Sequence, residues 1–156
     1  MKYNRIIIAI IVLICIAAGL FICVFYSRRT IGSNSGYSYS IQPSSNGSDL
    51  WVISTPKITK ITLSKSTKNA LSYEVELQEY KKNVDEITKL EKSLEKKLVF
   101  LSNAEIDKVA KSSPDEAKRI LGTRYSYSVY ETCKEIAKYE EMCEQIMMSL
   151  GSSISE

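Results

Sequence analysis

The chain has 156 residues and carries 21 Lys and Arg against 18 Asp and Glu, so its formal net charge is +3 at pH 7. This balance lacks the basic excess with which nucleic-acid-binding proteins neutralise phosphates, so we expect no nucleic-acid partner. The chain contains no histidine, which removes the commonest general base and the commonest transition-metal ligand. We therefore expect no catalytic, cofactor-binding or metal-binding site and no small-molecule substrate.

An apolar block occupies residues 6–26 and has no charge, no proline and no strongly polar side chain. A helix of this length covers about 30 Å, which matches the hydrocarbon core of a bilayer. A lone segment in lipid satisfies its backbone hydrogen bonds only as a helix. The block therefore predicts a single uncleaved transmembrane anchor after a short tail at residues 1–5. Its representative residues are Ile6, Ile10, Leu13, Leu20 and Phe25.

Two other interpretations of the block stay open. A buried core helix would usually be shorter and would keep a polar stripe, which this block lacks. A cleaved signal peptide fits the basic residues Lys2 and Arg5, with cleavage near Gly19, and would make the protein a secreted helical one. The apolar run continues through residues 20–25, where a mature terminus should turn polar, and this favours the anchor.

The charges that flank the block are nearly balanced and orient it weakly. Lys2, Arg5 and the α-amino group lie on one side, and Arg28 and Arg29 lie on the other. The amino group tips the balance toward a cytosolic N-terminus. We expect a single-pass membrane protein whose C-terminal domain lies outside the cytosol or in a lumen.

Two segments of different composition follow the block. Residues 27–49 are rich in Ser, Gly and Asn and poor in apolar side chains. Such a composition buries too little surface to offset its ordering entropy, so it predicts a flexible stalk. Residues 50–68 are enriched in β-branched and aromatic residues and predict one or two short strands, with Pro56 interrupting or ending the first.

A helical period begins after the predicted strands. From residue 71 to residue 101, apolar side chains recur every three or four positions, which predicts a long amphipathic helix. Glu91 interrupts the apolar stripe, so the pattern is not a strict zipper. A narrow stripe on a helix this long is buried best against a second long helix, either in the same chain or in another copy.

Three capping boxes divide the rest of the chain. They begin at Ser102, Ser113 and Ser128, each with Glu three residues later. They predict helices at residues 103–112, 114–121 and 129–150, with a stop at Gly151 and a disordered tail at residues 152–156.

The last helix can fold back on the first. We therefore predict a mainly α fold class, with a small, coiled-coil-like helical hairpin domain at residues 69–151. The seam between its two long helices is expected at Leu77, Val84, Ile87, Leu94, Leu98, Ile136, Ile146 and Leu150.

Two cysteines and a group of carboxylates are the remaining candidates for a site. Cys133 and Cys143 are ten residues apart on one predicted helix, or about 15 Å along its axis, too far to bridge each other. They are candidates for intermolecular disulfides, or they are buried free thiols. Glu140, Glu141 and Glu144 are typical of a solvated helix face.

The pattern predicts a non-enzymatic, single-pass membrane-anchored protein. Its extramembrane helical domain would mediate protein–protein interaction or scaffolding near the bilayer, with another protein or with a second copy. Two alternatives stay open. One is a small thiol-dependent membrane redox protein that uses Cys133 or Cys143, and the other is the secreted helical protein described above.

Overall fold

The computed structural model describes residues 30–43, 49–57, 61–64 and 70–154. A four-stranded antiparallel sheet precedes a set of helices, and the strands follow one another in the order β1-β2-β3-β4. The mainly helical class and the short sheet at its N-terminal side are confirmed. The elements are β1 (Ile31–Gly32), β2 (Ser38–Pro43), β3 (Asp49–Ser54), β4 (Ile61–Ser64), α2 (Ala70–Lys96), α3 (Asn103–Ala110), α4 (Pro114–Leu121), the short 3-10 helix η1 (Gly122–Arg124) and α5 (Tyr127–Ile154).

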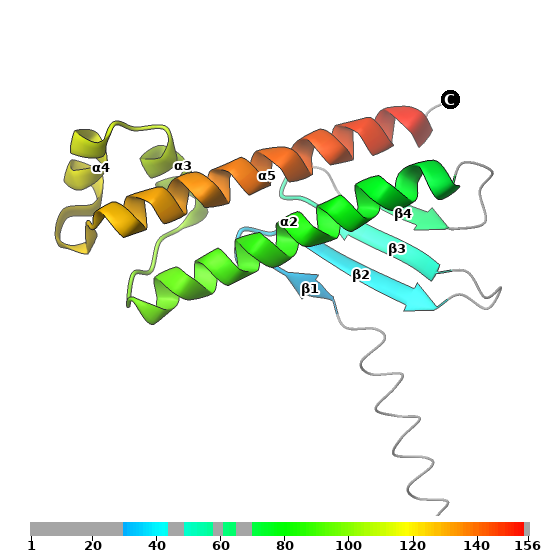
Figure 1. Ribbon diagram of the computed structural model, residues 1–156, viewed down its shortest axis with the longest axis horizontal. Helices are drawn as coiled ribbons and strands as arrows, with labels where there is room; N and C mark the ends of the chain where they lie inside the picture. The colour runs from blue at the N-terminus through cyan, green and yellow to red at the C-terminus, as the bar shows by residue number, and fades with distance from the viewer. Residues whose placement is uncertain (1–29, 44–48, 58–60, 65–69, 155–156) are drawn as a thin grey trace, which may run out of the picture.

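The two long helices α2 and α5 lie side by side and run in opposite directions, with the sheet against them and the short helices α3 and α4 at one end (Figure 1). Both helices bury one apolar stripe in a common core. Seven of the eight predicted seam residues lie in that core: Leu77, Val84, Ile87, Leu94, Ile136, Ile146 and Leu150.

The prediction for Leu98 is wrong. Helix α2 ends at Lys96, and the side chain of Leu98 is 79% exposed. Its backbone has a φ of 57°, in the left-handed region, which reverses the chain and turns the side chain away from the seam. Val99, the next residue, takes the buried position instead.

The sheet packs against the helices through every second side chain of β2 and β3, and two tyrosine hydroxyls form hydrogen bonds between the sheet and α2. Trp51 and Ile53 of β3 and Tyr39 of β2 point into the core. The Tyr39 hydroxyl donates to Asp85 of α2 at 2.8 Å, and the Tyr80 hydroxyl donates to the Ser54 carbonyl at 2.6 Å. The sheet is therefore part of the same core as the helical hairpin and not a separate layer.

The predicted flexible stalk is wrong for residues 30–43 and 49, which belong to the folded domain. Strand β2 pairs with β3 over six residue pairs, from Ser38 opposite Ser54 to Pro43 opposite Asp49. The alternation of Tyr37 and Tyr39 with small serines buries two large rings although the average composition is polar. The rest of that segment and the predicted anchor, including Ile6, Ile10, Leu13, Leu20 and Phe25, lie outside the described residues.

The capping signals place the short helices with one exception. Ser102 closes a complete capping box with Glu105, and Ser113 accepts from the Glu116 amide with Pro114 in the first turn. The box at Ser128 does not form, because α5 already begins at Tyr127 and Ser126 accepts from the Val129 amide.

Helix α5 also continues through Gly151 to Ile154, so the predicted stop and the disordered tail are wrong for residues 152–154. None of the helices in the described part of the chain combines the length and the apolar character needed to cross a bilayer.

Candidate functional site

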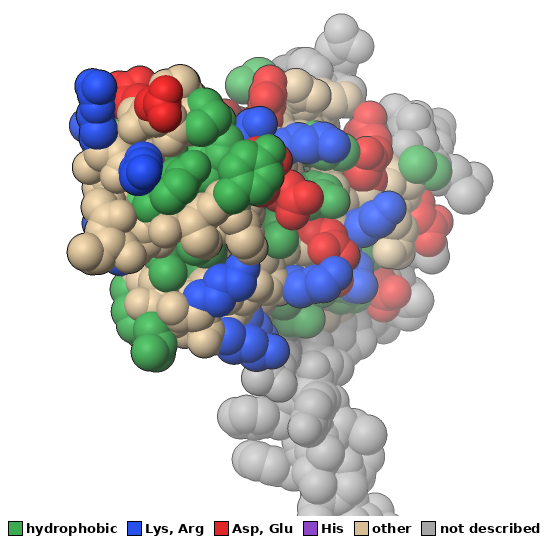
Figure 2. Space-filling view, turned by 60° about the vertical axis from the view of Figure 1, so that its left-hand side comes forward, with side chains coloured by type: hydrophobic (Ala, Val, Ile, Leu, Met, Phe, Trp, Pro, Cys, Tyr) green, Lys and Arg blue, Asp and Glu red, His purple; other side chains and the backbone are tan. Residues whose placement is uncertain are grey.

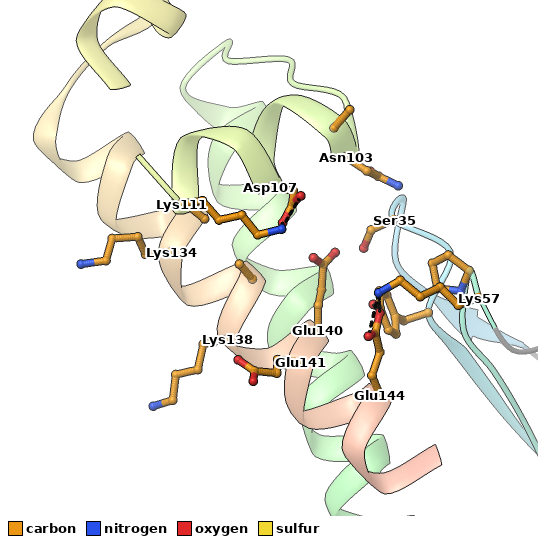
Figure 3. Close-up of a pocket in the computed structure, with 15 residues that line it drawn as sticks. Ser35, Lys57, Asn103, Asp107, Lys111, Lys134, Lys138, Glu140, Glu141 and Glu144 are labelled. Carbon is orange, nitrogen blue, oxygen red and sulfur yellow. Dashed lines mark hydrogen bonds and ion pairs between the residues drawn. The ribbon is translucent and has the colours of Figure 1, made fainter. Parts of the chain in front are cut away.

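An open groove of about 720 Å³ lies where the β1–β2 loop, the end of β3, helix α3 and helix α5 meet (Figure 3). Ser35 and Tyr37 come from the loop and Lys57 from the segment after β3. Asp107 comes from α3, and Glu140 and Glu144 come from α5. The groove therefore joins residues that are up to 109 positions apart in the chain, from Ser35 to Glu144.

The loop that forms one wall of the groove is held by Glu91, the residue that interrupts the apolar stripe of α2. The Glu91 carboxylate is buried and accepts the Asn34 amide at 2.8 Å and the Ser35 amide at 3.0 Å, one on each oxygen. The Asn34 side chain also donates to Glu95 at 3.0 Å. Gly36 closes the turn with a φ of 91°, a conformation that favours glycine. Two hydrogen bonds to one charge compensate its burial and fix the loop on α2.

Glu144 and Asp107, two of the acidic residues that line the groove, each have a cation. Lys57 Nζ lies 2.8 Å from both carboxylate oxygens of Glu144, and the Tyr37 hydroxyl donates to the same carboxylate at 2.9 Å. Burial raises the pKa of Glu144, but the Lys57 and Tyr37 hydrogen bonds outweigh it and leave that pKa below its usual value. Lys111 lies 2.7 Å from Asp107.

Glu140 is different, because it makes no ion pair with any other residue that the structure describes. Its side chain projects from the middle of α5 into the groove, between Asp107 and Ser35 (Figure 3). Burial raises its pKa, the Ser35 hydroxyl opposes this by a hydrogen bond, and the charges of Glu91, Asp107 and Glu144 raise it further. The carboxylate is thus a half-buried charge in an acidic environment, where a cation would be favourable.

The groove is lined mainly by charged and polar side chains. Within the described ranges, no three His, Cys, Asp or Glu side chains are arranged to hold a metal ion. Cys133 and Cys143 are fully buried, and burial raises the pKa of their thiols to about 11 and about 12. Neither cysteine lines the groove. Burial and a raised pKa lower the reactivity of both thiols in the folded domain, which favours the free-thiol interpretation. The intermolecular disulfides and the thiol-dependent redox alternative stay predictions.

The sequence interpretation of the acidic face is wrong for two of its three residues. Glu141 is exposed as expected, whereas Glu140 and Glu144 are half-buried in the groove. The groove depends on a loop and on a helix that are distant in sequence, so no local pattern identifies it. The sequence does show Glu91 as a polar interruption of the apolar stripe of α2. Such an interruption is a local sign of a buried charge, and here that charge binds the β1–β2 loop.

No family model, no curated protein and no solved structure matches this chain.

Proposed function

We propose that the protein is a non-enzymatic, single-pass membrane protein whose extramembrane helical domain binds a protein partner close to the bilayer. The apolar block at residues 6–26 supports the anchor by its length and composition. Strand β1 begins at Ile31, five residues after that block ends. Such a short connection would keep the domain near the membrane and raise its effective concentration there.

The observation that carries the interaction role is the Glu140 carboxylate, which projects into an open groove and makes no ion pair with any described residue, although Lys57 lies in the same groove. A Lys or Arg side chain of a partner polypeptide would supply that cation and lower the cost of the half-buried charge. The groove is wide and open, with lysines of α5 on its rim, as suits a polypeptide segment better than a small molecule.

The test is crosslinking of the full-length protein in its native membrane, followed by quantitation of the captured partner for matched variants. Glu140→Gln removes the charge in the groove, and Glu141→Gln removes the same charge from the exposed neighbouring position. We expect Glu140→Gln to weaken capture about tenfold or more, because it removes one member of a charge pair. Glu141→Gln should capture like the wild type. Equal capture by both variants would refute the role of the groove.

The membrane arrangement needs its own measurement. Extraction with alkaline carbonate should leave the chain in the membrane pellet, and its release would refute the anchor. For topology, Lys118→Cys introduces an exposed thiol on α4, while Cys133 and Cys143 are buried and add little background. We propose that the domain is extracytoplasmic or luminal, so a membrane-impermeant maleimide should label this variant from outside intact cells, or from the luminal side of vesicles.

A further inference from the structure

The C-terminal end of α2 carries exposed apolar and basic side chains that the core does not use. Leu98 is 79% exposed and Phe100 is 67% exposed. Lys92, Lys96 and Lys97 are exposed in the same turns. These five residues are named the α2 tip below. Figure 2 turns this end of the molecule toward the viewer and shows hydrophobic side chains among Lys and Arg side chains on its surface.

In the α2 tip, Leu98 occupies a backbone conformation that is usually taken by glycine. The Val99 amide donates to the Leu94 carbonyl at 3.0 Å and the Leu98 amide to the Glu95 carbonyl at 2.9 Å, the hydrogen-bond pattern of a Schellman motif. In that motif Leu98 occupies the left-handed position, where glycine is usual, with a φ of 57°. Leu98 therefore combines a left-handed backbone, which is strained for a leucine, with an exposed apolar side chain. A strained residue of this kind points to a function.

The α2 tip lies beside the point where the described chain begins. Thr30 and Ile31 line the same hollow as Lys92 and Glu95 of α2. Four residue steps separate Thr30 from Tyr26, the last residue of the apolar block, and a fully extended chain covers about 14 Å over that distance. If the block spans a bilayer, the membrane surface is within reach of the α2 tip.

We infer that the α2 tip rests on the bilayer surface, with Leu98 and Phe100 in the interfacial layer and the three lysines on anionic headgroups. This inference rests on the membrane anchor of the proposed function. Apolar side chains flanked by lysines are typical of segments that lie in the interface, and each lysine near an anionic surface contributes to binding. Glu95 is the acidic side chain in these turns, and it already accepts from Asn34.

A lipid surface fits the α2 tip better than a second copy of the chain does. A stable protein interface buries about 800 Å² on each partner, and two exposed apolar side chains fall well short of that. A tethered domain needs only a weak contact with the surface beside it, because the anchor already brings the two together. The contact would fix the orientation of the domain relative to the bilayer.

The inference is tested with full-length protein in vesicles of phosphatidylcholine and phosphatidylglycerol that carry brominated acyl chains. Phe100→Trp places a reporter in the α2 tip, and Val75→Trp places a matched one at the far end of α2, where Val75 is 71% exposed. The native Trp51 is buried and forms a common background. We expect a blue shift and a loss of emission through bromine quenching for Phe100→Trp but not for Val75→Trp. Replacing each lysine of the α2 tip by Gln should weaken the contact about fivefold.

Equal emission from both reporters in brominated and unbrominated vesicles would overturn the inference. A blue shift without bromine quenching that grows with protein concentration would overturn it in favour of a second copy. In either case, retention of the protein after an alkaline wash would leave the anchor standing. Release by that wash would remove the proposed anchor itself, so the two failures are distinguishable.

Discussion

Replacing Leu98 by glycine tests whether the left-handed turn after α2 is strained. Leu98 has a φ of 57° and occupies the glycine position of a Schellman motif. In this region a side chain brings Cβ close to the following carbonyl, and the conformation costs about 1–2 kcal/mol for a residue that is not glycine. Leu98→Gly removes that cost, whereas Leu98→Ala keeps it while removing most of the side chain.

The magnitude follows from three contributions. Relief of the left-handed conformation adds about 1.5 kcal/mol to the free energy of unfolding. The greater freedom of glycine in the unfolded chain subtracts about 0.7 kcal/mol. The leucine side chain is 79% exposed, and losing its small buried part subtracts about 0.4 kcal/mol. We expect Leu98→Gly to be about 0.4 kcal/mol more stable than the wild type, and Leu98→Ala to be about 0.4 kcal/mol less stable.

The assay is thermal unfolding of the full-length protein in detergent micelles, followed by circular dichroism and by the emission of Trp51, the single tryptophan. A difference of about 0.8 kcal/mol between the two variants corresponds to about 3 °C in Tm for a domain of this size. If both variants lose the same stability, the leucine side chain packs on the domain and its backbone is not strained. That result would refute the reasoning.

Three further predictions concern buried polar groups. Glu91→Ala should lower the free energy of unfolding by about 3 kcal/mol in urea titrations, because the amides of Asn34 and Ser35 lose a charged acceptor. A smaller loss would mean that water accepts these two hydrogen bonds in place of the Glu91 carboxylate. Glu140→Gln should raise the free energy of unfolding above that of the wild type, because the pKa of Glu140 is raised in the folded domain. The difference between variant and wild type should be absent below about pH 4, where the carboxyl is protonated, and should grow as the pH rises through that raised pKa. An advantage that shrinks with rising pH would show the opposite sign of the shift. Cys133 and Cys143 should resist maleimide in the folded protein at pH 8. With a pKa of about 11 for Cys133 and about 12 for Cys143, only about one thiol in a thousand and about one in ten thousand are ionised. Rapid labelling detected by mass spectrometry would disprove their burial.

The long helices and their pairing could be predicted from the sequence because the responsible signals are local. An apolar stripe with a period of three to four residues is visible in any window along α2 and α5. The caps of α3 and α4 at Ser102 and Ser113 depend on side chains three residues apart. Leu98 shows the limit of such a pattern, because periodicity does not reveal where a helix ends without a glycine.

The sheet was underestimated because average composition conceals alternation. The stretch from Tyr37 to Ile41 alternates aromatic or aliphatic residues with serine, which is a strand pattern within a polar segment. Pairing with β3 and burial against α2 supply the stabilising free energy that the polar average composition does not indicate. The groove was not predictable, because the environment of Glu140 is created by Ser35 and Asp107 from distant parts of the chain.

The short pairing of β1 determines how the domain would respond to mechanical load. A pull on Thr30 acts on an edge strand held by only two residue pairs, Ile31 with Tyr39 and Gly32 with Ser38. These two residue pairs would separate one after the other. The next resistance is the pair of hydrogen bonds that ties Asn34 and Ser35 to Glu91, so force would then pass into α2 and spare the ladder between β2 and β3. The two hydrogen bonds that Glu91 of α2 accepts from the β1–β2 turn would thus protect the rest of the domain from a force applied through the chain before Thr30.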